Sequence, residues 1–233
     1  MLARFICSLF RMEGEKLTLY HSPRSRSAKV VWLLAEEPSL QKVVAIQHVV
    51  TSRGEQNTPE FRKINPMGKI PSLSLGGGGG APVLSESTAI CVFLLEHAAP
   101  QSALLPAAGS VARARVYELA AFSVTAELVL QPGFRQLMPH YTPVEQRSLA
   151  VVQESLDRFR TEVAPWVRER MVGPYYLGET FTVCDVLLGF LLNWFLMPLW
   201  DEHASRGDDP YEDFALYVRR VTSRPSWALA ATL

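Results

Sequence analysis

The pattern of apolar and polar residues predicts two short strands on either side of a helix near the start of the chain. Leu17 to Tyr20 is a short apolar stretch typical of a strand. From Ala28, apolar residues recur at helical spacing as far as Pro38. The β-branched segment Val43 to Val50 is bounded by polar residues and predicts a second strand.

The segment from residue 51 to residue 98 predicts a helix, a hairpin and another helix. Thr58-Pro59-Glu60 is typical of a helix start, because proline is favoured at the first helical position. Ile70–Leu75 and Ala81–Leu84 suit two short strands joined by the turn Gly76–Gly80, and a helix follows over Glu86–Ala98. The order βαβαββα is that of an α/β, thioredoxin-like domain, in which the first crossover is right-handed and joins parallel strands.

The second half of the chain shows only helical patterns. Val111–Leu130 is apolar at helical spacing, and we expect Pro132-Gly133 to kink or end this helix. A second long helix is predicted over Val144–Met171, with a kink or early stop at Pro165. The sequence therefore predicts a thioredoxin-like domain over 15–98, an Ala- and Pro-rich linker over 99–109 and an all-helical domain over 110–233.

Two further helices are predicted near the C-terminus. Thr182 and Asp185 have the spacing of a capping box, so we assign them a structural role at the start of an apolar helix. That helix, Val186–Leu199, is predicted to be buried in the core, because it is too short for a membrane span of about 20 residues. Tyr211–Val221 is predicted to be the last helix, ending before Pro225.

Composition narrows the choice of partners and compartment. Lys plus Arg and Asp plus Glu both total 23, so the net charge gives no support to nucleic acid or a membrane surface as a partner. The cysteines (Cys7, Cys91 and Cys184) are odd in number and widely spaced, which favours reduced thiols in the cytoplasm. Residues 1–11 carry arginine but no acid, so organelle targeting is a weaker alternative to an ordinary tail.

The most informative stretch lies between the predicted second helix and the last helix of the first domain. Asn65-Pro66-Met67-Gly68-Lys69-Ile70-Pro71 leads through the hairpin to Leu84-Ser85-Glu86-Ser87-Thr88-Ala89-Ile90. This pattern, N-P-x-G-K-x-P followed by L-S-E-S-x-A-I, resembles the glutathione-binding half of soluble glutathione transferases. The architecture of the rest of the chain, from about Leu17 to Ala228, is also similar to that of the family.

The resemblance implies roles for six residues. The proline would be cis, with Ile70 before it pairing its backbone with the cysteinyl part of glutathione. Glu86 and Ser87 would hold the γ-glutamyl end beside the free amides of a helix N-terminus. Lys69, and more weakly Gln56, would contact the glycyl carboxylate. These assignments give the candidate substrate-binding set Gln56, Lys69, Ile70, Pro71, Glu86 and Ser87.

The turn His21-Ser22-Pro23-Arg24-Ser25-Arg26-Ser27 supplies the candidate catalytic hydroxyl. Counting from the first strand to the first helix, Ser25 falls where serine-type (theta-like and bacterial) transferases place their catalytic serine. Tyr20 falls where tyrosine-type classes place theirs, and Ser22 or Ser27 are further alternatives. Ser25 is favoured because it directly precedes the helix, although it is equally placed for an ordinary N-cap.

The resemblance implies an enzyme that conjugates glutathione, as co-substrate, to hydrophobic electrophiles and forms a homodimer. No cofactor or metal is expected: the five histidines are isolated in sequence and are interpreted as surface or boundary residues. Alternative hypotheses are a glutathione-dependent isomerase or peroxidase and a non-catalytic transferase-like interaction module. The zeta-type signature S-S-C-S-x-R and the first-turn cysteine of omega-type thiol transferases are absent from the turn at Ser25.

Overall fold

The computed structural model describes residues 16–76, 80–203 and 211–232. The predictions for the targeting segment 1–11, for Cys7 and for most of the glycine turn (77–79) lie outside these residues. The chain divides into two compact units, Met1–Pro100 with Leu229–Leu233 and Gln101–Ala228. The boundary after Pro100 falls within the predicted linker, whereas residues 229–233 group with the first unit and not with the predicted helical domain.

A four-stranded mixed sheet forms the centre of the first unit. The spatial order is β2-β1-β3-β4, in which β1 pairs with β2 in parallel and β3 pairs antiparallel with both β1 and β4. Leu19 of β1 and Leu73 of β3 are fully buried and lie opposite each other in the register. The strands are β1 Leu17–His21, β2 Val44–His48, β3 Ser72–Ser74 and β4 Val83–Ser85.

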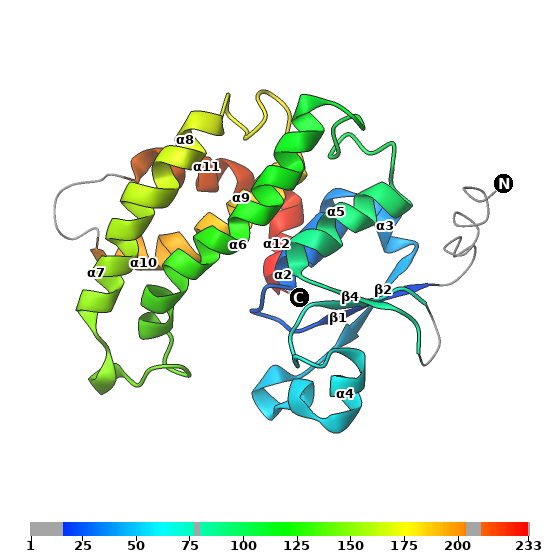
Figure 1. Ribbon diagram of the computed structural model, residues 1–233, viewed down its shortest axis with the longest axis horizontal. Coiled ribbons are helices and arrows are strands. Elements are labelled where there is room, and N and C mark those ends of the chain that lie inside the picture. The colour runs from blue at the N-terminus through cyan, green and yellow to red at the C-terminus, as the bar shows by residue number, and fades with distance from the viewer. Residues whose placement is uncertain (1–15, 77–79, 204–210, 233) are drawn as a thin grey trace. The chain divides into compact units, whose positions relative to one another are not determined.

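Helices cover both faces of this sheet. The apolar residues of α2 (Ala28–Glu36) and α5 (Ser87–Ala98) pack against each other and against the short α3 (Pro38–Gln41) on one face. Figure 1 shows α4 (Pro59–Ile64) on the opposite side of the sheet. The predicted βαβαββα order is confirmed, with α3 and the 3₁₀ turns η1 (Thr51–Arg53) and η2 (Glu55–Asn57) in addition.

The second unit is helical, and its longest helix does not end where the sequence predicts. α6 runs over Val111–Leu137 and contains Pro132, although proline lacks the amide that a helix interior needs. The neighbouring amide of Gly133 donates to Ser155 Oγ of α7 at 2.9 Å, so packing against α7 supports the helix at this point. A Cβ at residue 133 would lie 2.9 Å from the Ser155 Cβ, so only glycine permits this approach.

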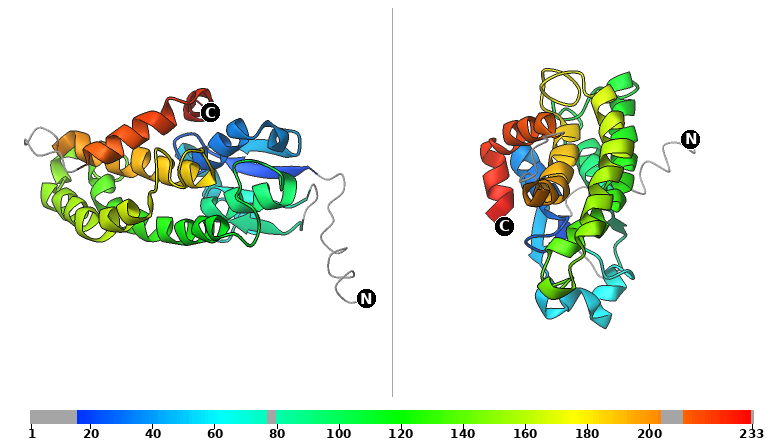
Figure 2. Two further views of the ribbon diagram at one scale, coloured as in Figure 1. Left: turned by 90° about the horizontal axis from the view of Figure 1, so that it is seen from above. Right: turned by 90° about the vertical axis from the view of Figure 1, so that its left-hand side faces the viewer.

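The predicted second long helix begins later and contains a wider turn. A 3₁₀ turn η3 (Val144–Gln146) precedes α7 (Leu149–Arg158), which continues through the π-helical segment η4 (Phe159–Val163) into α8 (Ala164–Arg170). Pro165 has no amide to donate, and the π turn just before it lets the helix continue without a stop. Figure 2 shows this continuous helix beside α6, with which α7 packs.

The apolar helix near residue 190 is the core of the second unit. It comprises α9 (Val183–Leu191), the π segment η5 (Leu192–Leu196) and α10 (Met197–His203). Val183–Asp201 is long and apolar enough to cross a membrane, but 72% of its most apolar window is buried inside the protein. The prediction of a buried core helix is therefore confirmed.

The predicted capping box at the start of α9 is present and forms part of a larger network. The Asp185 carboxylate accepts from the backbone and hydroxyl of Thr182, from the Tyr176 amide and from the Tyr217 hydroxyl, at 2.7–3.2 Å. Burial, and after it the charge of Asp185, raises the pKa of Tyr217 well above its usual value, so this phenol remains a donor.

The prediction of the last helix is wrong in one respect. α11 (Glu212–Thr222) lies where the sequence predicts it, but a further helix, α12 (Pro225–Thr232), follows. Pro225 ends the preceding turn and at the same time starts the next helix, where proline is favoured.

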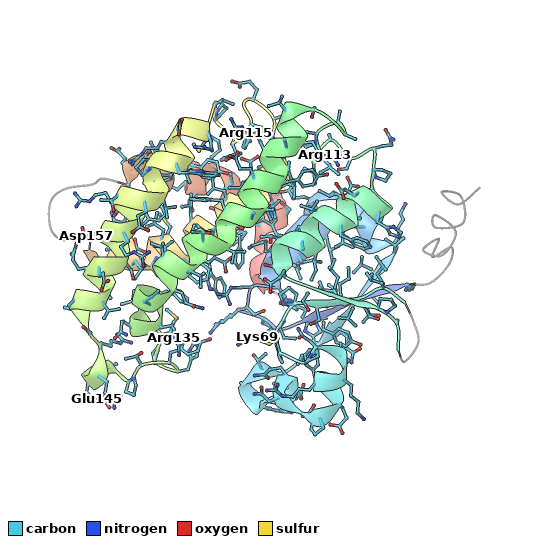
Figure 3. The ribbon with its side chains drawn as sticks, in the orientation of Figure 1. Lys69, Arg113, Arg115, Arg135, Glu145 and Asp157 are labelled. Carbon is cyan, nitrogen blue, oxygen red and sulfur yellow. The ribbon has the colours of Figure 1, made fainter. Side chains whose placement is uncertain are left out.

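At the start of α6, Arg113 fixes the linker to this helix by donating through Nε to the Pro106 carbonyl at 2.8 Å (Figure 3).

Candidate functional site

Three segments that are distant in the sequence meet at one end of the sheet in the first unit. Tyr20 of β1 pairs with Ser72 of β3, and Ser72 pairs with Ser85 of β4. Because β3 runs antiparallel to both neighbours, its first residue lies beside the last residues of β1 and β4. The turn that follows His21, the Ile70–Pro71 step and the start of α5 are therefore neighbours.

The loop before β3 is held in place by one buried side chain. The Ile70–Pro71 peptide bond is cis, as the sequence resemblance implied. Asn65 Nδ2 lies 3.1 Å from the Lys69 carbonyl, 3.0 Å from Ser72 Oγ and 3.3 Å from Ser85 Oγ. Asn65 thus connects the loop to β3 and β4. It is the first residue of the N-P-x-G-K-x-P motif, but the motif by itself does not indicate this positioning role.

The start of α5 presents a strained residue and a buried hydroxyl. Glu86, exposed to solvent, has φ +70°, a conformation that costs a non-glycine residue about 1–3 kcal/mol and that is concentrated at functional sites. Ser87 is the first residue of the helix and is buried. Its hydroxyl lies at the helix N-terminus, where free amides and the helix dipole favour an anion.

A lysine that sequence analysis did not single out lies beside this hydroxyl. Lys29, in the first turn of α2, is fully buried, and its Nζ donates to Ser87 Oγ at 3.3 Å. Its charge also reaches the buried thiol of Cys91 on the next turn of α5, where it opposes the rise in pKa caused by burial. The site therefore combines a helix N-terminus with a buried cation, which strengthens its preference for a carboxylate.

The serine turn contains the favoured catalytic candidate and a compact set of polar contacts. Ser25 is half-buried, and its Oγ lies 2.6 Å from Ser27 Oγ and accepts from the Ser27 amide at 3.2 Å. The α2 amides at Ala28, Lys29 and Val30 are bonded to backbone carbonyls of residues 25–27. The Ser25 hydroxyl is thus not used as a conventional cap of α2.

The interpretation of every histidine as a surface or boundary residue is wrong for His21. This residue ends β1 with no exposed surface, and its Nδ1 lies 2.7 Å from Ser27 Oγ. The apolar–polar alternation of the strand placed it inward, because its ring is on the same face as Leu17 and Leu19. Spacing between histidines, which detects metal sites, carries no signal for such a contact.

The alternative hydroxyls have other environments. The Tyr20 ring packs edge-on against Phe61 of α4, with centroids 5.6 Å apart, and its side chain lies on the opposite face of β1 from His21. Ser22 is buried, and its Oγ bonds to Thr51 Oγ1 at 2.9 Å. Ser25 is more exposed to solvent than Ser22 and Ser27, the other two serines of this turn.

The structure also brings Gln56 close to the loop that carries Lys69. Gly68 has φ +60°, and a Cβ there would lie 2.8 Å from the Gln56 carbonyl, so this close approach requires glycine. Among the described residues, the Gln56 side-chain oxygen has no hydrogen-bond partner although it is buried. Lys69 is exposed in the loop between α4 and β3 (Figure 3).

Comparisons with known proteins find a matching family profile, curated relatives and similar solved structures. The family profile described as "Glutathione S-transferase, N-terminal domain" matches residues 19–102. A probable maleylacetoacetate isomerase of Drosophila melanogaster is 37% identical over 112 residues, which cover 48% of this chain and 43% of that protein. The glutathione S-transferase GstA of Escherichia coli O157:H7 is 26% identical over 172 residues, covering 73% of this chain and 76% of that protein.

Among solved structures, the chain is similar to the theta class glutathione S-transferase of Xanthomonas axonopodis pv. citri with glutathione bound. The TM-score is 0.69 and the identity 26%, and the match covers 94% of this chain and 98% of that one. The similarity thus extends over both units, whereas the profile match is confined to the first.

Proposed function

Because the chain belongs to the soluble glutathione S-transferase family, a family of enzymes, we propose that it binds glutathione in its first unit and activates the thiol for transfer to hydrophobic electrophiles. One observation carries this proposal: the serine turn, the cis Ile70–Pro71 step and the Glu86–Ser87 helix start lie together at one end of the sheet. The related theta class enzyme that was crystallised with glutathione supports the choice of thiol.

The two ends of the peptide would bind at different elements. The γ-glutamyl carboxylate fits the N-terminus of α5, where Ser87 Oγ and the Lys29 ammonium supply a hydroxyl donor and a cation. The exposed Glu86 carboxylate would accept from the γ-glutamyl amine. The backbone of Ile70 would pair with the cysteinyl part, and the glycyl carboxylate would reach toward Lys69 and Gln56.

Ser25 would stabilise the thiolate. A free thiol has a pKa of about 8.5, and lowering it by about two units requires roughly 2.7 kcal/mol of stabilisation of the anion. One hydrogen bond to a charged acceptor supplies about 1.5–3 kcal/mol, and a helix N-terminus adds about 0.3–1 kcal/mol. The Ser25 hydroxyl, in the turn that precedes α2, is therefore sufficient in magnitude.

The transfer itself then needs little from the protein. The thiol proton leaves to solvent, and the thiolate sulfur forms a bond to the electrophilic carbon. In a substitution, the leaving group departs with the electron pair of the bond that breaks. The protein's contribution is the population of thiolate at neutral pH and the fixed position of the sulfur.

Calorimetry and thiolate absorbance test the proposal. Native protein, Ser25→Ala and Tyr20→Phe are titrated with glutathione, and thiolate absorbance is followed across pH. We expect native protein and Tyr20→Phe to ionise the bound thiol below its free pKa, and Ser25→Ala to bind without this ionisation. Retention of ionisation in Ser25→Ala would assign the role to another hydroxyl, and failure of native protein to bind glutathione would favour an interaction module.

Glutathione-dependent isomerisation is a second candidate, favoured by the 37% identity to the Drosophila protein over 112 residues. The same thiolate would add to a double bond conjugated to a carbonyl, allow rotation about the resulting single bond, and leave again. Glutathione is then regenerated rather than consumed. Incubation with maleylacetoacetate and a trace of glutathione distinguishes the two, since only an isomerase turns over many equivalents of substrate per thiol.

We also propose that the protein is a homodimer in which α6 contributes to the interface. One face of α6 carries an apolar stripe of Tyr117, Ala121, Val124 and Leu128, and three of these side chains are 43–63% exposed. This face is apolar in sequence, but the residues of α6 that are buried within the unit lie on a different face. The apolar stripe therefore remains exposed in the single chain. Light scattering should show a dimer that Val124→Glu weakens, whereas Val111→Glu, off the stripe but also exposed, should leave it intact.

A further inference from the structure

The serine turn contains a chain of three side chains that reaches from the protein interior to the half-buried Ser25. His21 Nδ1 lies 2.7 Å from Ser27 Oγ, and Ser27 Oγ lies 2.6 Å from Ser25 Oγ. His21 and Ser27 have no exposed surface. Both distances lie within the ranges of hydrogen bonds of these types, so the three groups form one connected unit.

Counting donors and acceptors leaves two arrangements of the hydroxyl protons. A hydroxyl has one proton to donate and two lone pairs that accept. Ser25 Oγ already accepts from the Ser27 amide, and Ser27 Oγ already accepts from the Ser22 amide, both at 3.2 Å. Each oxygen therefore has one accepting position left, and the 2.6 Å contact between them can run in either direction.

In the outward arrangement, His21 donates from Nδ1 to Ser27, and Ser27 donates to Ser25. Both lone pairs of Ser25 are then occupied, so its own proton is directed away from the turn and is available to a ligand. In the inward arrangement, Ser25 donates to Ser27, and Ser27 donates to His21 Nδ1 or to the Ser22 carbonyl, which lies 3.2 Å away. Ser25 then has no proton to offer to a thiolate.

We propose that Ser27 and His21 are positioning residues that direct the Ser25 proton toward the glutathione sulfur, by relaying a hydrogen bond from the imidazole through the Ser27 hydroxyl. The inference rests on the proposed function, since it assigns Ser25 as the donor to the thiolate. A thiolate accepts but cannot donate, so its binding selects the outward arrangement. The buried imidazole, whose Nδ1 can act as donor or acceptor, follows by adopting the Nδ1–H form.

The relay explains why two serines lie two residues apart in the turn. Ser27 does not cap α2 with its side chain, and its Oγ is enclosed by His21, Ser22 and Ser25. Its effect on a bound thiol must therefore pass through Ser25. Removal of the Ser27 hydroxyl leaves the Ser25 oxygen in place but removes one of the two donors that fix its proton.

The experiment compares Ser27→Ala with Ser27→Thr and His21→Asn, using the pH dependence of thiolate absorbance and steady-state kinetics. Ser22→Ala is the matched control, because it removes a hydroxyl from the same turn whose partner is Thr51. We expect Ser27→Ala to raise the pKa of the bound thiol by about 0.5–1 pH unit and to lower kcat about three- to tenfold, with the KM for glutathione within about twofold of native.

Ser27→Thr, which keeps the hydroxyl, should restore both values, and His21→Asn, whose amide can donate from a similar position, should lie near native. Ser22→Ala should match native protein. A bound-thiol pKa in Ser27→Ala equal to that of native protein would overturn the relay. The relay would also be overturned if Ser27→Ala lost ionisation of the bound thiol while Ser25→Ala kept it, because Ser27 would then itself be the donor.

These outcomes are separate from failure of the proposed function. If native protein does not bind glutathione or does not lower its thiol pKa, the transferase proposal fails first. If native protein ionises the thiol and Ser25→Ala abolishes this ionisation, the transferase proposal stands whatever Ser27→Ala shows.

Discussion

Replacement of Lys29 by methionine should separate glutathione binding from thiol activation. Methionine has a similar length and fits a buried position, but it removes the ammonium that donates to Ser87 Oγ at 3.3 Å. A carboxylate that accepts from the Ser87 hydroxyl would lie about 5 Å from Nζ, given ordinary hydrogen-bond lengths. The lysine does not lie in the serine turn, so the thiolate donor stays in place.

The size of the effect follows from this separation. Two unit charges about 5 Å apart attract by roughly 3 kcal/mol at an effective dielectric constant of about 20. Because Lys29 has no exposed surface, screening by salt is small. Desolvation of the incoming carboxylate offsets part of the attraction, so we expect the Kd for glutathione to rise about 10- to 100-fold, equivalent to about 1.4–2.7 kcal/mol.

Calorimetry gives the Kd, and kinetics at saturating glutathione give kcat. Lys29→Met should raise the Kd and the KM for glutathione while kcat changes less than about threefold. The Kd of Lys29→Arg, which keeps the charge, should lie between those of native protein and Lys29→Met. Thermal unfolding of each variant checks that the first unit is intact. A folded Lys29→Met protein with native affinity for glutathione would refute the placement of the γ-glutamyl carboxylate beside Ser87.

Two further predictions concern buried groups. Asp185→Ala leaves four donors without their carboxylate, so the free energy of unfolding in urea should fall by about 3–5 kcal/mol. Tyr217→Phe removes only one of these donors and should cost about 1–2 kcal/mol; equal losses in the two variants would contradict this ranking. Burial raises the pKa of Cys91 to about 12 and that of Cys184 above its usual range, so neither thiolate forms as pH rises from 7 to 9. Alkylation followed by mass spectrometry should label both only after denaturation, and rapid labelling of the folded protein at pH 8 would show that the thiols are accessible.

Local pattern was sufficient for most elements of the first unit. The β1 strand, the β3–β4 hairpin and the starts of α4 and α5 follow from apolar alternation and from turn and cap residues, which act within a few positions of one another. The same is true of the capping box at Thr182 and Asp185, whose partners are three residues apart. Most candidate site residues could be identified because they lie in short sequence motifs, although their roles in binding remain predictions.

Proline positions show where local pattern is insufficient. Pro132 and Pro165 carry the same signal for a break, yet the first lies inside α6 and the second follows a π turn that continues the helix. Beside Pro132, a hydrogen bond from Gly133 to the Ser155 hydroxyl of α7 supports the helix, and this contact with another element leaves no signal in the sequence next to the proline. At Pro165 the accommodation lies within the same helix, as the π turn that precedes the proline.

Sequence patterns alone established the family resemblance, the order of strands and helices in the first unit and the segment that contains Ser25. Only the tertiary structure placed Lys29 beside Ser87, 58 positions away, and enclosed His21 and Ser27 behind Ser25. A lysine in a helical run and a histidine after a strand look like solvated residues, because charge and spacing do not reveal what a face packs against. Burial depends on the elements that cover a side chain, and those elements are brought together only when the sheet and its helices assemble.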